Sequence, residues 1–154
     1  LRRQLREKLG VQEARSEGGW LMWGELRDAL ERGEVVVLQA DRVMPGQKGK
    51  PAVFCGEQAE MPTGPVRLAQ LTGAPIVPVF AVRTRGKEIK LVIGEPILVG
   101  EDGDARAAQK KALQLLADAM SKQIHAYPEQ WLMLHSVWGS QASGLAMKGS
   151  PIIE

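Results

Sequence analysis

The chain has 154 residues, of which 44% are hydrophobic and 25% are charged, so it is long enough to bury a core without disulfide staples. Its net charge of +2 is too small to indicate nucleic-acid binding. The single cysteine, Cys55, excludes an internal disulfide, favours a reducing compartment and suits a small core position in a strand. The longest apolar run covers residues 74–82 and contains two prolines, whereas a membrane-spanning helix needs about 20 apolar residues.

The N-terminal part predicts two helices followed by a strand. Leucines recur every fourth residue over 1–9, which indicates a short amphipathic helix with a basic outer face. A second helix is expected over 22–32, with Gly33 as its C-terminal stop. Residues 35–38 form a β-branched run that is typical of a strand buried on both faces.

The middle of the chain predicts two strands on either side of a helix. Residues 51–55 form a short apolar strand. The helix that follows begins at Thr63, a residue type favoured at the N-cap, and ends at Gly73. Residues 76–82 predict a second buried strand, in which Pro78 requires an edge, a bulge or a local break in pairing.

The last third predicts a strand and the longest helix. Residues 88–93 alternate weakly in the manner of a strand, with 96–99 as an extension. A helix over 104–126 begins at a capping aspartate and is ended by Pro128. Residues 139–154 are rich in glycine and serine and lack periodicity, so we expect a flexible tail there.

Strands that alternate with helices favour an α/β fold with a largely parallel sheet flanked by helices. Residues 1–138 are expected to belong to one domain. Because ligands gather at the carboxyl ends of parallel strands, Asp41 and Arg42, which follow the 35–38 strand, are candidates for positioning a polar substrate. Asp41 also suits a turn in which the aspartate binds its own loop backbone, and on the residues alone the turn is the commoner role.

Gly64, Arg67 and Arg83 are further candidates for binding a substrate. A glycine beside a helix N-terminus lets backbone N–H groups approach an anion, and Arg67 in the same helix can bind a phosphate in a bidentate manner. Arg67 equally suits a solvated position on an amphipathic helix. Arg83 follows the strand predicted over 76–82, where an exposed arginine is the commoner interpretation unless the end of the sheet forms the site.

Other kinds of site are excluded by residue spacing. The glycine- and lysine-rich residues 46–51 lack the serine or threonine of a phosphate-binding P-loop. No pair of cysteines or histidines has the spacing of a zinc site, and no Gly-x-Ser-x-Gly nucleophile elbow occurs. The sequence therefore predicts neither a metal nor a cofactor.

Taken in order and spacing, six segments resemble the C-terminal part of the lipid A biosynthesis acyltransferase family, in the lysophospholipid acyltransferase superfamily. They are Gly33-Glu34-Val35-Val36, Asp41, Phe54-x-Gly56, Pro62 to Ala69, Gly73 to Pro78, and Pro128 to His135. The resemblance covers residues 20–138 and implies a glycerolipid acyltransferase-like α/β fold that is incomplete at its N-terminus.

The resemblance implies an enzyme that transfers a fatty acyl chain from an acyl thioester, on acyl carrier protein or coenzyme A, to a hydroxyl of a lipid A precursor or similar glycolipid. Enzymes of this kind use a histidine with an acid five positions later to deprotonate the acceptor hydroxyl. His125 and His135 are followed at that spacing by Gln130 and Ser140, so neither forms the pair. The base is therefore expected upstream, and this chain alone is expected to be inactive.

The resemblance also assigns roles to individual residues. It implies that Asp41 supports the active site, and that a family arginine upstream of Asp41 corresponds to Arg6 or Arg15. The residues expected to bind the substrate are Arg6, Arg42, Gly64, Arg67 and Arg83.

The implied partners are the carrier of the acyl donor, a lipid acceptor and a membrane surface, with no nucleic acid. The implied location is the cytoplasmic face of a bacterial inner membrane. Two rival functions stay open. One is a non-catalytic acyl-carrier or lipid-binding module, and the other is an acyltransferase for another acceptor such as phosphatidylinositol mannoside.

Overall fold

The computed structural model describes residues 2–14, 20–43, 47–84, 86, 88–100, 104–133 and 137–138. In chain order, the elements are α1 (Arg2–Lys8), α2 (Trp20–Glu31), β1 (Lys50–Phe54), β2 (Glu57–Met61), α3 (Gly64–Thr72), β3 (Val79–Arg83), β4 (Ile89–Ile93), α4 (Ala105–Ala126) and the short 3-10 helix η2 (Pro128–Gln130). The tail expected at 139–154 lies outside the described residues.

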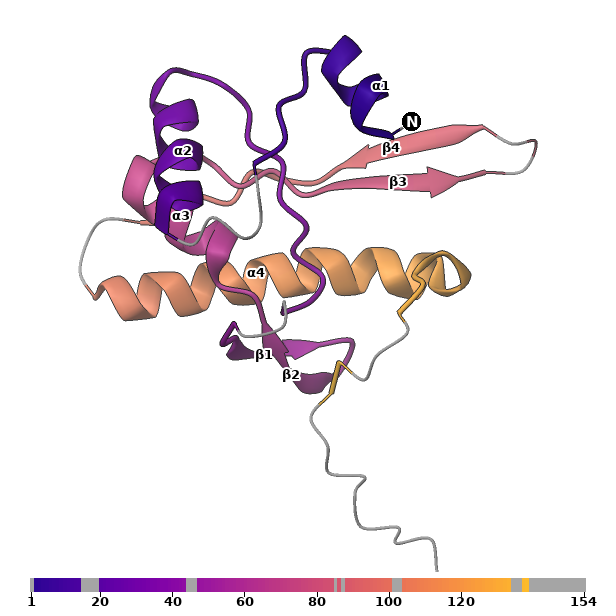
Figure 1. The fold of residues 1–154 in the computed structure, drawn as a ribbon. Coiled ribbons are helices and arrows are strands. Elements are labelled where there is room, and N and C mark those ends of the chain that lie inside the picture. Colours follow the sequence, from indigo (N-terminus) through magenta and orange to yellow (C-terminus); the bar gives the residue numbers. More distant parts are fainter. Residues whose placement is uncertain are drawn as a thin grey trace, which may run out of the picture.

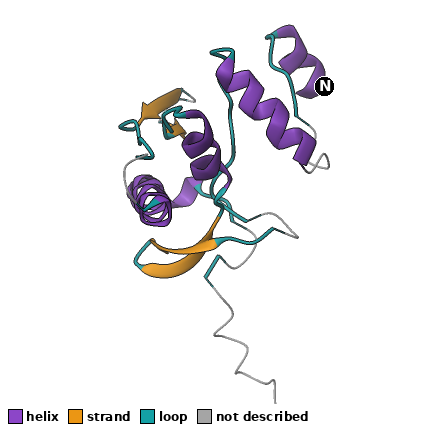
Figure 2. Cartoon of the chain, turned by 90° about the vertical axis from the view of Figure 1, so that its left-hand side faces the viewer, coloured by secondary structure: helices purple, strands orange, loops and turns teal. Residues whose placement is uncertain are grey.

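Helix α4 runs between two β-hairpins, one on each side (Figure 1). Strands β1 and β2 pair antiparallel, with Lys50 opposite Met61, and β3 and β4 pair antiparallel, with Val79 opposite Ile93. Figure 2 looks nearly along α4 and shows the hairpins on its opposite sides. The α/β class is confirmed, but neither sheet formed by the described residues contains parallel strands.

Residues 35–38 are extended but pair with no strand in the described part of the chain. Val35 and Val37 are each 88% exposed, whereas Val36 and Leu38 are half-buried. A strand that is buried on both faces needs neighbouring strands to pair its backbone groups. The expectation of such a strand at 35–38 is therefore wrong for this structure.

The core lies between α4, α3 and the β1–β2 hairpin. Its largest fully buried side chains are those of Phe54, Met61 and Val66. The apolar face of α4 packs into the core: Leu113, Leu116 and Met120 are buried, and Ile124 is half-buried and packs against that core. The buried residues that α4 contributes are Ala112, Leu113, Leu116, Ala117 and Met120.

The helix ends follow the capping residues that the sequence suggests, with one exception. Gly73 adopts a left-handed conformation (φ +70°) after α3, and its N–H donates to the carbonyl of Ala69 at 2.8 Å. The Asp104 carboxylate accepts the N–H of Arg106 at 2.8 Å and so caps α4. Thr63 stands at the N-cap of α3, but its side chain makes no capping bond.

Cys55 lies in the turn between β1 and β2 and not in the expected strand. Its φ of +51° and the φ of +89° at Gly56 are the left-handed conformations of a two-residue type I′ hairpin turn. The Cys55 N–H donates to Ser121 Oγ of α4 at 2.9 Å, and the half-buried thiol side chain still packs against the core. Helix α4 therefore holds the tip of this hairpin.

Strand β3 begins three residues later than the strand predicted over 76–82. Ile76 forms an isolated antiparallel bridge with Ile97, in which each N–H donates to the other residue's carbonyl. Pro78 follows, and its carbonyl accepts the Gly94 N–H at 2.8 Å. Pro78 thus marks a local break between two pairings, as its missing N–H predicts. Alternate residues of β3 are exposed, so the strand is not buried on both faces.

Helix α1 lies apart from α4 (Figure 1). Leu5 is 59% exposed and Leu9 is 71% exposed, so the apolar face of this helix is open to solvent. None of the described helices is both long enough and apolar enough to cross a membrane.

Candidate functional site

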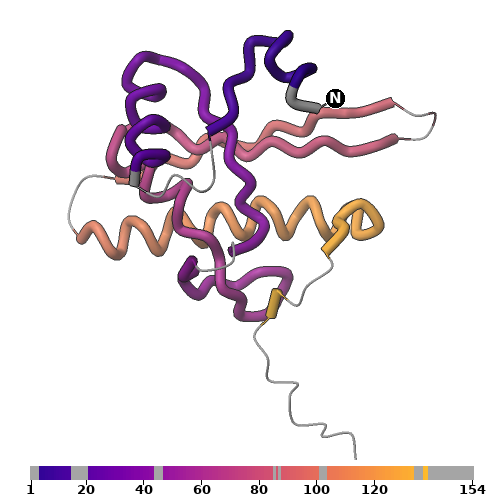
Figure 3. The backbone as a smooth tube through the Cα atoms, viewed as in Figure 1, coloured from indigo at the N-terminus to yellow at the C-terminus, as the bar shows by residue number. Residues whose placement is uncertain are grey.

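An apolar groove of about 1150 Å³ lies between residues 33–41, the stretch 74–82 and α4. Figure 3 follows the chain from the end of α2 past the beginning of β3 and down toward α4. Helix α4 contributes Leu116, Met120 and Ile124 to the lining. The groove is larger than most small-molecule clefts, which enclose roughly 300–1,000 Å³. Among its lining residues, only Glu34 and Asp41 carry a charge.

The Asp41–Arg42 pair lies at the C-terminal end of residues 33–41, which line one side of the groove. The guanidinium of Arg42 binds the neighbouring carboxylate with two bonds, from Nη2 to Oδ2 at 2.8 Å and from Nε to Oδ1 at 3.2 Å. The Asp41 side chain is 26% exposed and that of Arg42 is 41% exposed. The bond to Asp41 and its negative charge raise the pKa of Arg42, so the guanidinium stays protonated. A bidentate pair of this kind fixes the plane of the carboxylate at the edge of the groove.

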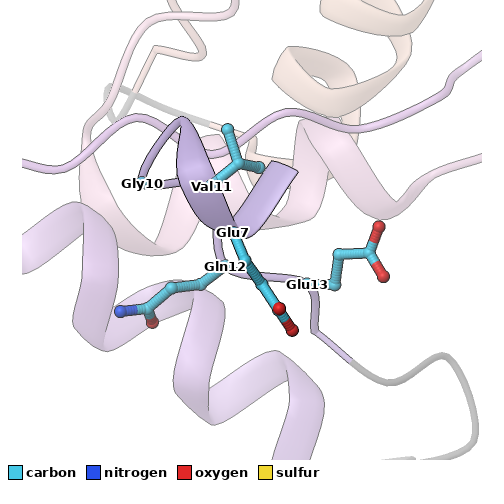
Figure 4. Close-up of a pocket in the computed structure, with 5 residues that line it drawn as sticks. All are labelled: Glu7, Gly10, Val11, Gln12 and Glu13. Carbon is cyan, nitrogen blue, oxygen red and sulfur yellow. The ribbon is translucent and has the colours of Figure 1, made fainter. Parts of the chain in front are cut away.

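Arg6 lies on α1 and forms an ion pair with Glu13. Both residues belong to the exposed N-terminal segment. Figure 4 shows the adjoining hollow, about 330 Å³ in volume, with the carboxylates of Glu7 and Glu13 among its lining side chains. A hollow with two carboxylates is unsuited to an anion, and Arg6 is not part of the groove that Asp41 lines. Arg15, the alternative to Arg6, lies outside the described residues.

Gly64 begins α3, where the sequence suggested an anion-binding helix end. A Cβ at this position would lie 2.5 Å from Cη2 of Trp23, which belongs to α2. The indole ring therefore occupies the space that a side chain at position 64 would fill. Arg67, one turn further along α3, is exposed to solvent and does not line the groove. The structure thus favours a packing role for Gly64 and a solvated position for Arg67.

Arg83 ends β3, and its side chain is exposed. Its backbone is held by Gln130 of η2: the Arg83 N–H donates to Oε1 at 2.7 Å, and Nε2 donates to the Arg83 carbonyl at 2.9 Å. Gln130 also lines the groove, whereas Arg83 does not. The sequence named Gln130 only within the segment Pro128 to His135 and as the residue five positions after His125, because no local pattern links it to Arg83, 47 positions away.

The residues after η2 close one end of the core. Phe54, Trp131 and Trp138 form an aromatic cluster with ring centroids 5.5 to 6.4 Å apart. The indole N–H of Trp138 donates to the Phe54 carbonyl at 3.1 Å. Trp131 also lines the groove, and its buried indole N–H has no hydrogen-bond partner among the described residues. These contacts give the aromatic residues after η2 a packing role at one end of the core.

The described histidine, His125, does not line the groove. His125 is exposed in the last turn of α4, and His135 lies outside the described residues. No group of three or more histidine, cysteine, aspartate or glutamate side chains is close enough to hold a metal ion in the parts of the chain that the structure describes.

Residues 2–140 match the family model for bacterial lipid A biosynthesis acyltransferase. The chain belongs to this family. The resemblance seen in the ordered sequence segments is therefore confirmed, and with it the general class of acyltransferases.

Two similar members of the family are mycobacterial. The phosphatidylinositol mannoside acyltransferase of Mycobacterium tuberculosis (strain ATCC 25618 / H37Rv) is 34% identical over 137 residues, which make up 86% of this chain and 40% of that protein. The phosphatidylinositol mannoside acyltransferase of Mycolicibacterium smegmatis (strain ATCC 700084 / mc(2)155) is 32% identical over 137 residues, covering 88% and 42% respectively. The chain thus spans about two fifths of the length of these curated relatives.

Proposed function

We propose that this chain is the C-terminal part of an acyltransferase that moves a fatty acyl chain from a thioester to a hydroxyl of a glycolipid. The match to the acyltransferase family over residues 2–140 carries this proposal. The bidentate Asp41–Arg42 pair supports it, because it places an oriented carboxylate at the edge of the groove.

The proposed acceptor is a phosphatidylinositol mannoside or a lipid A precursor, both of which are glycolipids. The first is favoured by the two relatives, which are named as phosphatidylinositol mannoside acyltransferases. The proposed donor is acyl carrier protein or coenzyme A carrying the acyl chain as a thioester. The enzyme would meet its acceptor at the cytoplasmic face of the plasma membrane, where the lipid presents its headgroup.

The reaction exchanges one acyl bond for another. A general base takes the proton of the acceptor hydroxyl, and the oxygen attacks the thioester carbonyl carbon. The new C–O ester bond forms as the C–S bond breaks, and the thiolate leaves and takes up the proton that the base removed. His125 and His135 lack an acidic residue five positions later, so we place the base in a part of the parent protein outside this sequence.

In this proposal, Asp41 acts by positioning the acceptor. Its carboxylate is already bound on one side by Arg42 and can accept a hydrogen bond from a sugar hydroxyl on the other. Correct orientation of the attacking oxygen is one of the largest contributions that a protein makes to such a reaction. Arg83 and Arg67 are exposed outside the groove, and Arg6 is exposed although it is paired with Glu13. All three are proposed to contact phosphates of the carrier or headgroup at the surface.

The parallel sheet expected from the sequence is proposed to form in the parent protein. The apolar segment 35–38, which is extended but unpaired in the described residues, would be one of its strands. The carboxyl end of that strand would then place Asp41 at the edge where ligands gather in α/β folds.

The test is an acyl-transfer assay on the full-length parent protein, with a labelled acyl thioester and either glycolipid as acceptor. Asp41→Asn should lower kcat by at least about 10-fold, the effect of losing roughly 1.4 kcal/mol of transition-state stabilisation. No transfer to either glycolipid by the folded wild-type protein would refute the proposed activity.

Asp28→Asn is a matched control for this variant. Asp28 is also paired with its neighbouring arginine, with Arg27 Nη2 2.7 Å from Oδ1, but it lies on α2 and does not line the groove. Turnover should be unchanged in this control. An equal loss of turnover in Asp28→Asn and Asp41→Asn would show that the effect is not specific to the site.

A further inference from the structure

Strand β3 has one paired edge and one open edge. The Gly94 N–H donates to the carbonyl of Pro78, so in this ladder the even-numbered residues turn their backbone groups toward β4. In an antiparallel pair, the intervening residues turn theirs to the opposite edge. Val79 and Ala81 therefore present N–H and C=O groups on the open edge, where they bond to no other described residue.

The end of this open edge is closed by Gln130. Its side-chain amide accepts from the N–H of Arg83 and donates to the carbonyl of the same residue, at 2.7 and 2.9 Å. A primary amide that accepts and donates at once makes the same two bonds that a paired strand residue would make. A strand that pairs with Val79 and Ala81 would therefore end where Gln130 begins.

Strand β1 shows a completed edge in the same molecule. Gln114 of α4 binds the N–H and the carbonyl of Val53, both at 2.9 Å, and Ser121 accepts the N–H of Cys55. Pro51 has no N–H to offer. The N–H groups on the outer edge of β1 are thus all hydrogen-bonded or absent. On the outer edge of β3, the N–H and C=O groups of both Val79 and Ala81 have no partner among the described residues. An open edge of this kind is a template for an additional strand.

The open edge borders the apolar groove. Residues 33–41 line its far side, and Leu116, Met120 and Ile124 of α4 contribute to the lining. We propose that this groove receives a β-strand from a part of the parent acyltransferase outside these 154 residues, placed between β3 and residues 35–38. Its side chains toward α4 would be apolar. The inference rests on the proposed identity of the chain as part of a longer enzyme, whose curated relatives contain the matched region as only 40–42% of their length.

A strand fits this place better than a fatty acyl chain does. An acyl chain would cover the apolar lining, but it has no groups that could pair with the open N–H and C=O of Val79 and Ala81. An inserted strand does both, and it also supplies a neighbour for the unpaired segment 35–38. Strands in a sheet lie about 4.8 Å apart, so β3 and 35–38 would be about 9.6 Å apart, each on one side of the new strand.

Amide hydrogen exchange of the full-length protein, resolved to single residues, tests the proposal. The amides of Phe80 and Val82, which bond to β4, serve as internal references for local stability. We expect the amides of Val79 and Ala81 to be protected within about 10-fold of these references, because an added strand closes both edges. Rapid exchange of Val79 and Ala81 beside slow exchange of Phe80 and Val82 would overturn the proposal.

The same measurement distinguishes a strand of the parent protein from other occupants of the groove. Protection that appears only after an acyl thioester is added would indicate an acyl chain or a ligand-driven closure, and protection that vanishes on dilution would indicate a second copy of the protein. Either result contradicts the proposal. Exchange does not depend on turnover, so a protein that shows the expected protection without acyl transfer would refute the proposed function and leave the strand in place.

Pairs of introduced cysteines test whether residues 35–38 themselves lie directly beside the open edge of β3. Each of positions 36, 37 and 38 is combined with Val79→Cys or Ala81→Cys in the full-length protein. A disulfide needs Cα atoms about 4.4–6.8 Å apart, so no pair should oxidise if a strand lies between the two segments. Efficient oxidation of any pair would show that 35–38 lies directly beside β3 and would refute the insertion.

Discussion

Trp23 and Gly64 are in such close contact that a larger residue at position 64 would require the indole ring or the helix to shift. An added Cβ would be 2.5 Å from Cη2 and 3.3 Å from Cζ2 of the indole. This contact joins the first turn of α2 to the first residue of α3. It explains the glycine by packing, where the sequence alone suggested an anion-binding site.

Gly64→Ala should destabilise the protein by about 1–3 kcal/mol, because overpacking forces the ring or the helix to move. Gly24→Ala is the matched control. A Cβ at position 24 meets nothing within 4 Å, and Gly24 lies inside α2, so alanine should stabilise by about 0.8–1 kcal/mol through its helix propensity. The shifts in the urea midpoint of unfolding measure both effects. Equal shifts in the two variants would contradict the Trp23 contact.

Gln130→Glu should weaken the attachment of η2 to β3. Glutamate can still accept the Arg83 N–H, but an ionised carboxylate cannot donate to the Arg83 carbonyl. The loss of one hydrogen bond should lower the free energy of unfolding by about 0.5–1.5 kcal/mol. Gln58→Glu, an exposed position on β2, should change it by less than about 0.5 kcal/mol. Unchanged thermal unfolding in Gln130→Glu would show that this attachment is dispensable.

Cys55 is the one described residue other than glycine with a positive φ, and this allows a test of the turn. Asparagine tolerates this conformation and is the favoured first residue of a type I′ turn before glycine. A β-branched side chain does not tolerate it, at a cost of about 1–2 kcal/mol. Cys55→Asn should therefore be more stable than Cys55→Val by at least about 1 kcal/mol in chemical unfolding. The reverse order would mean that core packing of the thiol, and not the turn, decides the stability.

The pKa of Glu34 is lowered from its ordinary value of 4.5, chiefly by the hydrogen bond from Arg32. A carboxyl group whose folded pKa is depressed stabilises the protein above its ordinary pKa, and this contribution is lost as the pH falls through the folded pKa. Glu34 is exposed, so the contribution should be small and weakened by salt. An NMR titration of the Glu34 carboxyl carbon should show the low pKa in wild type and its return toward 4.5 in Arg32→Gln. Identical titration curves would contradict the Arg32–Glu34 pair.

The sequence predicts the elements whose signals are local. Helix α4 was expected because the apolar residues Leu113, Leu116, Met120 and Ile124 recur at helical spacing between a capping aspartate and Pro128, and the structure confirms it over Ala105–Ala126. Strand β2, which reads Glu-Gln-Ala-Glu-Met, was missed. Three of its five residues are polar, and it becomes a strand through pairing with β1 across a Cys-Gly turn that lacks the usual Asn-Gly signal.

Features that depend on distant residues could not be predicted. The apolar run at 35–38 has the composition of a buried strand, but burial requires neighbours that the described residues do not supply. Asp41 and Arg42 were singled out because they follow the apolar run at 35–38, whereas Gln130 binds Arg83 across 47 positions and left no local pattern. The same holds for Gly64, since its partner Trp23 belongs to another helix.

The β3–β4 hairpin has a consequence for handling the isolated polypeptide. Ile89, Leu91 and Ile93 are 63–70% exposed on β4, next to the unpaired groups of β3. An exposed apolar strand beside an unpaired sheet edge readily pairs with the same hairpin of other molecules. Produced by itself in a cell, the 154-residue polypeptide should therefore precipitate as its concentration rises. Leu91→Lys, which places a positive charge in the middle of β4, should keep the polypeptide in solution.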